Sequence, residues 1–474
     1  MDIYSILKQQ VGDRNIEKQN PALRIWKAWY RGKYRPFHNY YVTTGLGVKT
    51  RLEKATLGMA KAVSEAWADL LMNENTKIVL PETDHEQMQE ILDTNNFKYL
   101  MNDLIEKAYA LGCGAVIVGV NNLSIDGDGN SLGDGILKIQ YIDAEKVYPL
   151  TFENGKCTEC AFVSSSTNRT TISIHMINDD GFYEIKNSYY KGTGTQLIYE
   201  GEDDAFITYS TKPLFTLIKP AIANNFDIDN PLGISIYANA IDQLKSIDNI
   251  YDSLDNEFIL GKKRLFLSTD LDRIDSEGNR TRDYFDPHDV LIYHIPQDEK
   301  GNNLISSQSD ELRAEAHVTA LNGQLSTLSV KCGLGKGYFT FNGAEMRLAN
   351  TATEVMAKNA DLFRTIKKHE KVLEQALKDI VEAIIFVCNN FTNIHFNDIL
   401  RSEIKVLFDD SIFEDKESLK ESDRKDVTLG ALSLVEYRMK HYGETEEEAK
   451  TKIELIKQEK GNVDVESVLA GFGA

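Results

Sequence analysis

The sequence is poor in cysteine and contains no long hydrophobic run. It has 474 residues and only five cysteines, and a small odd number suits a reducing compartment better than a disulfide framework. The longest apolar stretch, DIVEAIIFVC at 379–388, is about half as long as a helix that spans a bilayer. The opening residues, MDIYSILKQQ, lack the charged and then apolar pattern of a signal peptide. These absences predict an intracellular, soluble protein.

Positive charge is also scarce. The chain has 53 Lys and Arg residues against 73 Asp and Glu residues, for a net charge of -20. Nucleic-acid binding over a broad surface needs clustered Lys and Arg, so this balance argues against it. The composition, 42% hydrophobic and 27% charged, is that of a folded globular protein. The length predicts two or more domains.

Metal-binding motifs are incomplete. Asp126, Asp128 and Asn130 have the spacing of a calcium loop, but Ser131 stands where glycine is needed and Leu137 where the bidentate Glu belongs. We interpret this stretch as a polar hairpin turn. No metal site is predicted.

Catalytic motifs are missing as well. Cys157 and Cys160 form one CxxC with no second pair and no nearby His, so we interpret the cysteines as buried thiols. His175 in a strand and His369 in a helix are interpreted as structural, because no HxxxH or HExxH motif occurs. No nucleophile elbow is present. The sequence therefore predicts no cofactor and no enzymatic activity.

One glycine-rich stretch, KCGLGKGYFTF at 331–341, resembles a phosphate-binding loop at first sight. Such a loop follows a strand, ends in Gly-Lys-Ser/Thr and opens a helix. Here a predicted helix comes before it, and Tyr338 follows Lys336 and Gly337. A nucleotide site is excluded on these grounds, and the simplest interpretation is a flexible connection between two helices.

Hydrophobic spacing predicts a mixed domain in the first half of the chain. A helix is predicted over 52–74, with an apolar face that includes Ala55, Met59, Ala62, Ala66 and Leu70, and a second helix over 84–111 that ends at Gly112. From 115 to about 210 the period changes to two, which is typical of a strand meander.

Long helices dominate the second half. Helices are predicted from 237 to 258 and from 310 to 330, on either side of an insert with short strands. A further helix of nearly 40 residues opens with a Thr351–Glu354 capping box, and Ser433–Glu436 and Thr445–Glu448 have the same spacing. Its apolar positions keep helical spacing: Leu362, Ile366, Leu373, Leu377, Ile380 and Ile384. The fold class is α+β.

Several of these segments, in this order along the chain, resemble portal proteins of long-tailed (siphovirus-type) double-stranded DNA bacteriophages. The segments that carry the resemblance are WKAWYRGKYRPFHNYY (26–41), MAKAVSEAWADLLMNE (59–74), SLDNEFILGKKRLFLS (253–268), ELRAEAHVTALNGQLSTLSVKCGLGKGYFTF (311–341), NTATEVMAKNADLFRTIKKHEKVLEQAL (350–377) and GETEEEAKTKIELIKQE (443–459).

The resemblance implies a domain order. It comprises a wing of N-terminal helices and β-meander (1–232), a stem helix (233–262), a small α/β clip (263–308), a second stem helix (309–332), a tunnel loop (333–350), a long wing helix (351–395), and a helical crown with the C-terminal tail (396–474).

The resemblance also implies function and partners. The chain would form a ring of identical subunits, a dodecamer, at one capsid vertex of the virion after assembly in the host cytoplasm. Double-stranded DNA would pass through the ring. The terminase large subunit, a head-completion or connector protein, and the major capsid and scaffolding proteins would be its partners, and no membrane would be involved.

Some basic and aromatic residues acquire expected roles from the resemblance. Lys336, Tyr338, Phe339 and Arg347 of the tunnel loop would face DNA, and Lys262, Lys263 and Arg264 would supply basic groups at the stem. Glycines would give the tunnel loop freedom to move. Two alternatives stay open from the residues alone, namely a non-viral oligomeric helical scaffold and an intracellular nucleotide-dependent enzyme.

Overall fold

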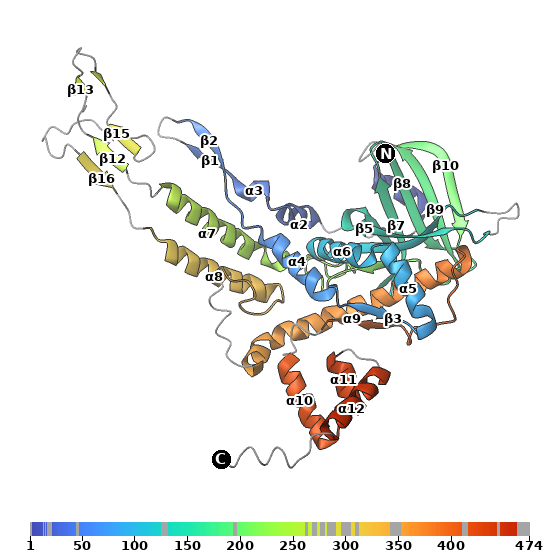
Figure 1. The fold of residues 1–474 in the computed structure, drawn as a ribbon. Helices are drawn as coiled ribbons and strands as arrows, with labels where there is room; N and C mark the ends of the chain where they lie inside the picture. The colour runs from blue at the N-terminus through green and yellow to red at the C-terminus, as the bar shows by residue number, and fades with distance from the viewer. Residues whose placement is uncertain are drawn as a thin grey trace, which may run out of the picture. The chain divides into compact units, whose positions relative to one another are not determined.

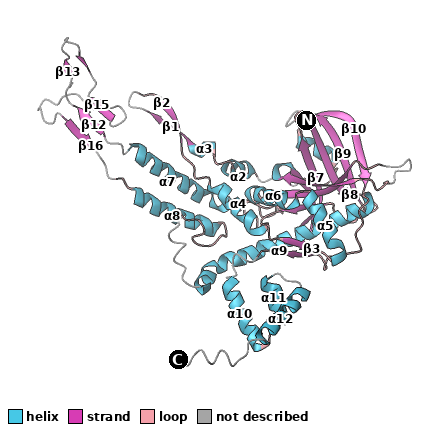
Figure 2. Ribbon diagram, viewed as in Figure 1, coloured by secondary structure: helices cyan, strands magenta, loops and turns pink. Residues whose placement is uncertain are grey.

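The structure is a computed structural model whose described parts form two compact units of helix and sheet (Figures 1 and 2). The first unit contains residues 1–348 and 360–408, and the second contains residues 349–359 and 409–474. The described residues are 2–12, 14, 16, 21–43, 47–124, 131–192, 197–260, 264–267, 273–274, 280–281, 291–294, 305–308, 312–341, 352–409, 416–442 and 446–461.

A five-stranded antiparallel meander confirms the predicted strands of the first unit. Its strands pair with their sequence neighbours in the order β10-β9-β8-β7-β6. They are β6 (Val147–Glu153), β7 (Lys156–Ser165), β8 (Arg169–Ile177), β9 (Tyr183–Lys191) and β10 (Ile198–Ile207).

Alternate residues of the meander enter two separate cores, as a period of two requires. Ala161 and Val163 pack with Ile6 and Leu7 of helix α1 (Ile3–Gln10) on one face. On the other face, Phe162 contacts a three-stranded sheet with the order β11-β4-β5. That sheet consists of β4 (Gly114–Asn121), β5 (Ile136–Asp143) and β11 (Phe215–Ile218).

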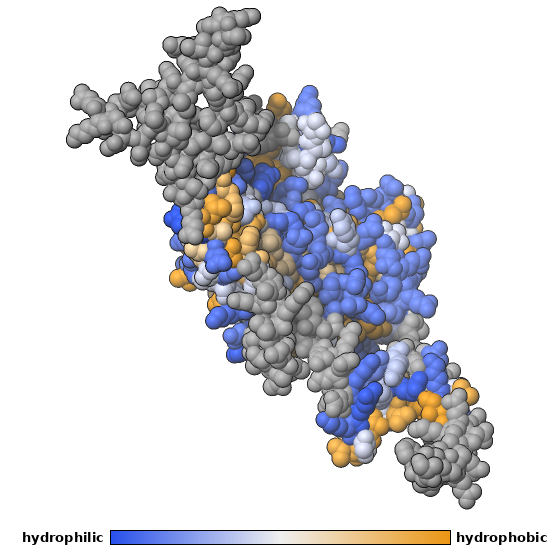
Figure 3. Space-filling view, turned by 60° about the vertical axis from the view of Figure 1, so that its left-hand side comes forward, coloured by the Kyte–Doolittle hydropathy of each residue, from blue (hydrophilic) through white to orange (hydrophobic). Residues whose placement is uncertain are grey.

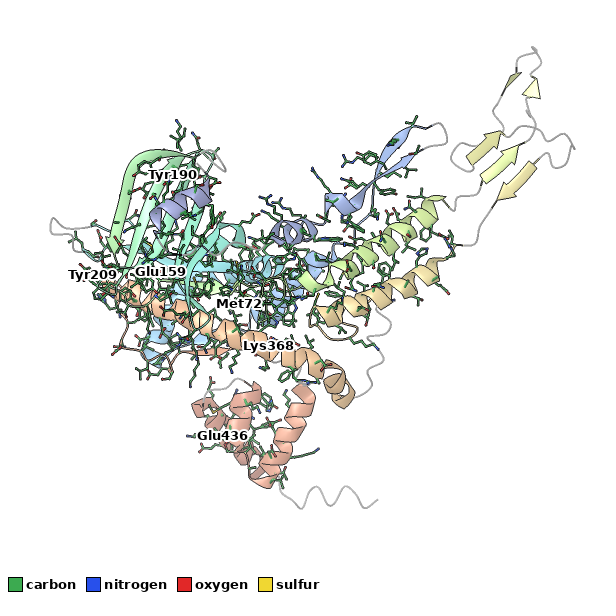
Figure 4. The ribbon with its side chains drawn as sticks, turned by 180° about the vertical axis from the view of Figure 1, so that it is seen from behind. Met72, Glu159, Tyr190, Tyr209, Lys368 and Glu436 are labelled. Carbon is green, nitrogen blue, oxygen red and sulfur yellow. The ribbon has the colours of Figure 1, made fainter. Side chains whose placement is uncertain are left out.

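A buried acid ties the start of the chain to this meander. Glu159 on β7, labelled in Figure 4, is 5% exposed and accepts two hydrogen bonds from the Arg14 guanidinium. It also accepts hydrogen bonds from the Thr151 hydroxyl and the Ile177 amide. Although burial opposes it, the Arg14 hydrogen bond and the other donors lower the pKa of this carboxyl.

The predicted helix over 52–74 is shorter than expected, and its buried face differs. Strand β2 (Lys49–Glu53) occupies the first residues, and helix α4 (Met59–Leu71) begins after Gly58, whose φ is 68°. Of the predicted face, Met59 and Leu70 are buried. The other buried members of α4 form an adjacent stripe: Ala60, Val63, Ser64, Trp67, Ala68 and Leu71. Alanines are compatible with both faces, which is why the pattern did not separate them.

The predicted single helix over 84–111 is two helices. Helix α5 (Glu82–Thr94) ends at Asn95, and helix α6 (Phe97–Leu111) begins after Asn96, which has a φ of 49°. A left-handed Asn interrupts the helical hydrogen bonds at little cost. The predicted end at Gly112 is confirmed, with a φ of 96°.

The N-terminal basic segment contains short elements. They are α2 (Leu23–Tyr30), α3 (Arg35–His38) and the strand β1 (Asn39–Thr43), which pairs with β2 alone. A short strand, β3 (Lys77–Val79), follows α4 and pairs with β17 (Lys405–Leu407). The first unit also contains the 3₁₀ turns η1 (Ala144–Lys146) and η2 (Ala238–Ala240).

Two long helices, one before and one after the insert in the sequence, pack side by side (Figure 1). They are α7 (Ile241–Leu260) and α8 (Ala314–Lys331), and they confirm the predicted pair. Five short strands are described between them: β12 (Arg264–Leu267), β13 (Arg273–Ile274), β14 (Arg280–Thr281), β15 (Leu291–His294) and β16 (Ile305–Gln308). Strand β12 pairs in parallel with β15 and antiparallel with β16.

The predicted long helix is continuous. Helix α9 (Ala352–Phe391) has 40 residues, and all six of its predicted apolar positions are buried. Residues 396–408, expected to begin the crown, group with the first unit through the pairing of β17 with β3. The Thr351–Glu354 capping box lies outside the described residues, because Thr351 is not among them.

Besides the first residues of α9, the described part of the second unit contains α10 (Lys416–Leu429), α11 (Leu434–Tyr442) and α12 (Glu446–Gly461). The predicted capping box at the start of α11 is confirmed. The Glu436 amide donates to the Ser433 hydroxyl at 3.1 Å, and the Glu436 carboxylate, labelled in Figure 4, accepts from the Ser433 amide at 2.9 Å. Thr445 of the other predicted box lies outside the described residues.

The burial of one face of α9 can be tested with substitutions at two adjacent residues, one buried and one exposed. Leu373 is 4% exposed, whereas the adjacent Val372 is 40% exposed. We expect Leu373→Asp to lower the free energy of unfolding by at least about 3 kcal/mol, because an unpaired carboxylate would enter an apolar core. Val372→Asp should change it by less than about 1 kcal/mol. Denaturant unfolding of the unassembled chain checks both, and equal effects would show that α9 does not bury this face.

Candidate functional site: the α7–α8 pair and the loop after it

Polar contacts near both ends clamp α7 to α8. At one end, the Arg313 guanidinium donates to both carboxylate oxygens of Glu257, at 3.0 and 2.8 Å. These hydrogen bonds lower the pKa of Glu257 to about 2. At the other end, the Lys331 ammonium donates to the Gln243 side chain at 2.9 Å and to the Asn239 carbonyl. The two helices are therefore fixed along most of their length.

Acidic residues of α7 attach the helix pair to the N-terminal segment. Asp248 is 3% exposed, and one of its oxygens lies 3.0 Å from Nε2 of His38. The same carboxylate accepts from the Thr56 hydroxyl and the Leu57 amide. Asp252, one turn further on, accepts from the Ala55 amide at 2.8 Å. These carboxylates therefore serve as hydrogen-bond acceptors that hold α7 to the N-terminal segment.

Helix α8 offers an almost uncharged exposed face. Leu321, Leu325 and Leu328 are buried, and Glu315 and Lys331 are the only Asp, Glu, Lys or Arg residues of the helix. Its exposed residues between these two are small or apolar: Ala316, Thr319, Ala320, Gly323, Thr327 and Val330. Figure 3 shows an apolar patch on the helix pair beside the grey residues. A cylinder of double-stranded DNA would find few charges to bind on such a face.

The glycine-rich stretch folds back on α8 instead of leaving it freely. Gly333, Gly335 and Gly337 have φ values of 77°, 79° and 78°, a region that favours glycine. The Phe339 amide donates to the Ser329 hydroxyl at 3.2 Å, and the Phe341 amide donates to the Asn322 side chain at 2.7 Å. In residues 333–341 the glycines therefore shape a specific turn against α8.

Close packing explains why residue 333 is a glycine. A Cβ on Gly333 would lie 2.9 Å from the Thr365 methyl group of α9 and 3.4 Å from the Trp67 ring of α4. Leu334 is 1% exposed. The turn is therefore seated between α4 and α9.

A buried aromatic cluster anchors the end of α8. The Trp67 indole N–H donates to the Cys332 carbonyl at 3.0 Å, and its ring stacks on His369 at 4.5 Å between centroids. Nδ1 of His369 accepts from the Ala221 amide at 3.1 Å and lies 2.8 Å from the Tyr109 hydroxyl. Burial lowers the pKa of His369 to about 3, so the ring is neutral and can accept these bonds.

The residues expected to face DNA fall into three groups. Lys336 is exposed, and Tyr338 and Phe339 are half-buried with their rings 5.0 Å apart in an edge-to-face contact. Arg347, Lys262 and Lys263 lie outside the described residues. Arg264 is the first residue of β12. The structure therefore brings Lys336, Tyr338 and Phe339 together at one turn.

The cysteines and His175 lie in the interior of the chain. All five cysteines are buried, and burial raises the pKa of the Cys113 and Cys160 thiols. His175 is 3% exposed, and burial lowers its pKa to about 4. Asp126, Asp128 and Asn130 lie outside the described residues. Among the residues that are described, no group of three or more His, Cys, Asp or Glu side chains could hold a metal ion.

Membrane crossing by a helix finds no support in the described parts of the chain. None of their helices combines sufficient length with sufficient apolar character.

The described chain combines two clamped long helices, an insert with short strands between them and a buried turn after the second helix. A family model described as "Phage portal protein, SPP1 Gp6-like" matches residues 13–465. The chain belongs to this family of phage portal proteins. The fold class predicted from the sequence is confirmed.

Other comparisons add less. No curated protein matches the sequence. One similar solved chain belongs to a structure titled "Neck of native GTA particle computed with C12 symmetry", with 11% identity and a TM-score of 0.40. The alignment covers 92% of this chain and 97% of that chain. A TM-score this low carries no argument about function.

Two features escaped the sequence analysis. The Trp67, Tyr109 and His369 cluster joins positions too far apart in sequence for any local pattern to reveal. The second feature is the basic N-terminal segment. The sequence does contain a signal for it, because eight Lys or Arg residues and one acidic residue stand between 21 and 54. The net charge of -20 concealed this local excess of base.

The buried histidines predict an acid-sensitive fold. His369 and His175 have pKa values of about 3 and 4 in the folded chain, below the usual value of about 6.5. Between these values the unfolded chain binds protons that the folded chain does not, so stability falls as pH drops below about 6.5. At pH about 5 each histidine should have cost about 2 kcal/mol.

A pair of variants checks this expectation. His369→Gln should reduce the loss of unfolding free energy between pH about 7 and about 5, even though it lowers stability at pH about 7 by removing the Trp67 contact. His395→Gln, at an exposed histidine, is made for comparison as the same substitution outside the core. An unaltered slope in His369→Gln would mean that His369 does not titrate abnormally.

Proposed function

We propose that this portal protein forms a closed ring, a dodecamer, at one vertex of a phage capsid, and that double-stranded DNA is packaged and ejected through it. The observation that carries the proposal is the family match over residues 13–465. The clamped α7–α8 pair supports it, because rigid paired helices suit a repeated wall around an axis. Closure of a ring requires a head-to-tail interface that repeats between identical subunits.

The surface of α8 is suited to DNA that must move. Small uncharged residues such as Ala316, Ala320 and Gly323 are exposed along it, and they offer no fixed phosphate contacts. The acidic character of the chain repels phosphate at longer range, within about 10 Å at ordinary salt. A channel wall of this kind lets DNA slide.

We assign the remaining parts by the same reasoning. Residues 1–232 and 351–395 form the wing, 233–262 and 309–332 the stem, 263–308 the clip, 333–350 the tunnel loop and 396–474 the crown and tail. The clip docks the terminase large subunit and later a head-completion or connector protein. Major capsid and scaffolding proteins surround the ring, which assembles in the host cytoplasm. The role is structural, and ATP hydrolysis belongs to the separate motor.

Assembly is the first test of the proposed function. We expect purified full-length protein to form rings with an axial hole in negative-stain images, and a single large mass in solution. A chain that stays monomeric or dimeric across protein concentration and salt would contradict the proposal.

Lys336 allows a test of DNA contact separate from assembly. Because Lys336 is exposed and Tyr338 packs on Phe339, Lys336→Ala should leave folding, ring formation and motor docking intact. We expect a lower DNA content, or poorer DNA retention, in heads built with the variant ring, since a mobile phosphate contact is lost. Lys8→Ala, at an exposed lysine of α1, is the matched control. Full heads with normal retention would remove Lys336 from the DNA path.

A further inference from the structure

The N-terminal segment concentrates positive charge in an otherwise acidic chain. A surface pocket of about 730 Å³ is lined by basic residues of α2, α3, β2 and their connections. We call these residues the N-terminal basic surface: Arg24, Lys27, Arg31, Lys33, Arg35 and Arg51. Glu53 and Glu145 are the acidic residues that line the same pocket.

Internal contacts neutralise only part of this charge. Lys27 forms an ion pair with Glu145, and Lys33 forms one with Glu53 at 2.5 Å. The remaining members are exposed arginines that form no ion pair with any residue that the structure describes: Arg24, Arg31, Arg35 and Arg51. Four guanidinium groups around one pocket can each bind an anionic oxygen pair in bidentate fashion.

The hairpin beside the pocket is largely exposed. Strands β1 and β2 pair only with each other among the described strands, and Tyr41 lies opposite Arg51 in their register. Tyr41 is 69% exposed, and Val42 and Leu52 are about 40% exposed. A two-stranded hairpin open on both faces is marginally stable in water. Its apolar side chains therefore favour a partner that covers them.

We propose that the N-terminal basic surface and hairpin β1–β2 together dock onto an acidic surface of a second copy of this chain. The inference rests on the proposed ring and names one of its subunit contacts. In a head-to-tail ring the patch and its acceptor are different surfaces of the same sequence. A chain with a net charge of -20 offers carboxylates to such a patch, and the resulting attraction offsets the repulsion between like-charged subunits.

A nucleic-acid ligand fits the same observations less well. Phosphates would pair with the arginines, but they would leave Tyr41, Val42 and Leu52 exposed to water. A protein surface can satisfy the guanidinium groups and bury these side chains at the same time. The combination of charge and exposed apolar area favours the second copy.

Charge reversal tests the contact in the full-length protein. Arg24→Glu/Arg51→Glu removes one cation from α2 and one from the hairpin, and neither side chain has an ion-pair partner among the residues that the structure describes. We expect the fraction of chain in rings to fall at least about tenfold at ordinary salt. Arg24→Lys/Arg51→Lys, which keeps the charge, should retain most of the assembly. Lys8→Glu/Lys191→Glu changes the net charge equally at exposed lysines elsewhere and should assemble normally.

A photo-crosslinking amino acid at position 41 gives a second measurement that does not depend on charge. In place of Tyr41 it should crosslink to another copy, at a peptide rich in Asp and Glu. Normal rings from Arg24→Glu/Arg51→Glu, or crosslinks confined to one chain, would overturn the inference while leaving the proposed ring intact. Crosslinks between copies without any ring would support the inference and contradict the proposed function.

Binding of a labelled DNA duplex separates the remaining possibility. We expect the unchanged protein and the Arg24→Glu/Arg51→Glu variant to bind the duplex equally weakly. If the duplex binds the unchanged protein tightly, and the reversal abolishes that binding without affecting ring formation, the surface belongs to nucleic acid and the inference is wrong.

Discussion

Segments that are far apart in the sequence meet at the side chain of Trp67. Its indole N–H holds the carbonyl that ends α8, and its ring covers His369 of α9, which in turn lies beside Tyr109 of α6. The site is dry enough to keep His369 neutral, so every polar atom in it depends on a protein partner. This cluster therefore holds the end of α8, the glycine turn after it and helix α9 in contact with one another.

Charge is sorted within the first unit by what each helix must contact. Asp248 and Asp252 of α7 form hydrogen bonds with the segment from His38 to Leu57, so acidic side chains of α7 join this helix to the N-terminal segment. Helix α8 keeps an exposed face of small neutral residues. The two helices therefore differ in charge and in use: α7 is bonded to the N-terminal segment, and α8 keeps a neutral exposed face.

Whereas the acidic side chains of α7 form hydrogen bonds inside the chain, the basic side chains of the N-terminal segment lie at the surface. The arginines around the pocket are exposed, and the hairpin next to them keeps Tyr41 largely in the solvent. An isolated chain gains nothing from such a surface, because unpaired cations and open apolar strands do not stabilise a fold. Their value lies in association. The same chain therefore presents a neutral face on α8 and, at the N-terminal basic surface and hairpin β1–β2, exposed arginines and apolar side chains that a partner could bind.

The sequence by itself determined the elements that repeat regularly: the alternating strands from β6 to β10, the 40-residue helix α9 and the capping box at Ser433. Local periodicity and capping chemistry are enough for these, and the missing Ser or Thr after Lys336 was enough to exclude a phosphate loop. Tertiary structure decided the rest. The pairing of β17 with β3 and the packing of Gly333 against Thr365 depend on neighbours distant in sequence. Such contacts override local propensity, because burial of a specific partner is worth more than the preference of any single residue.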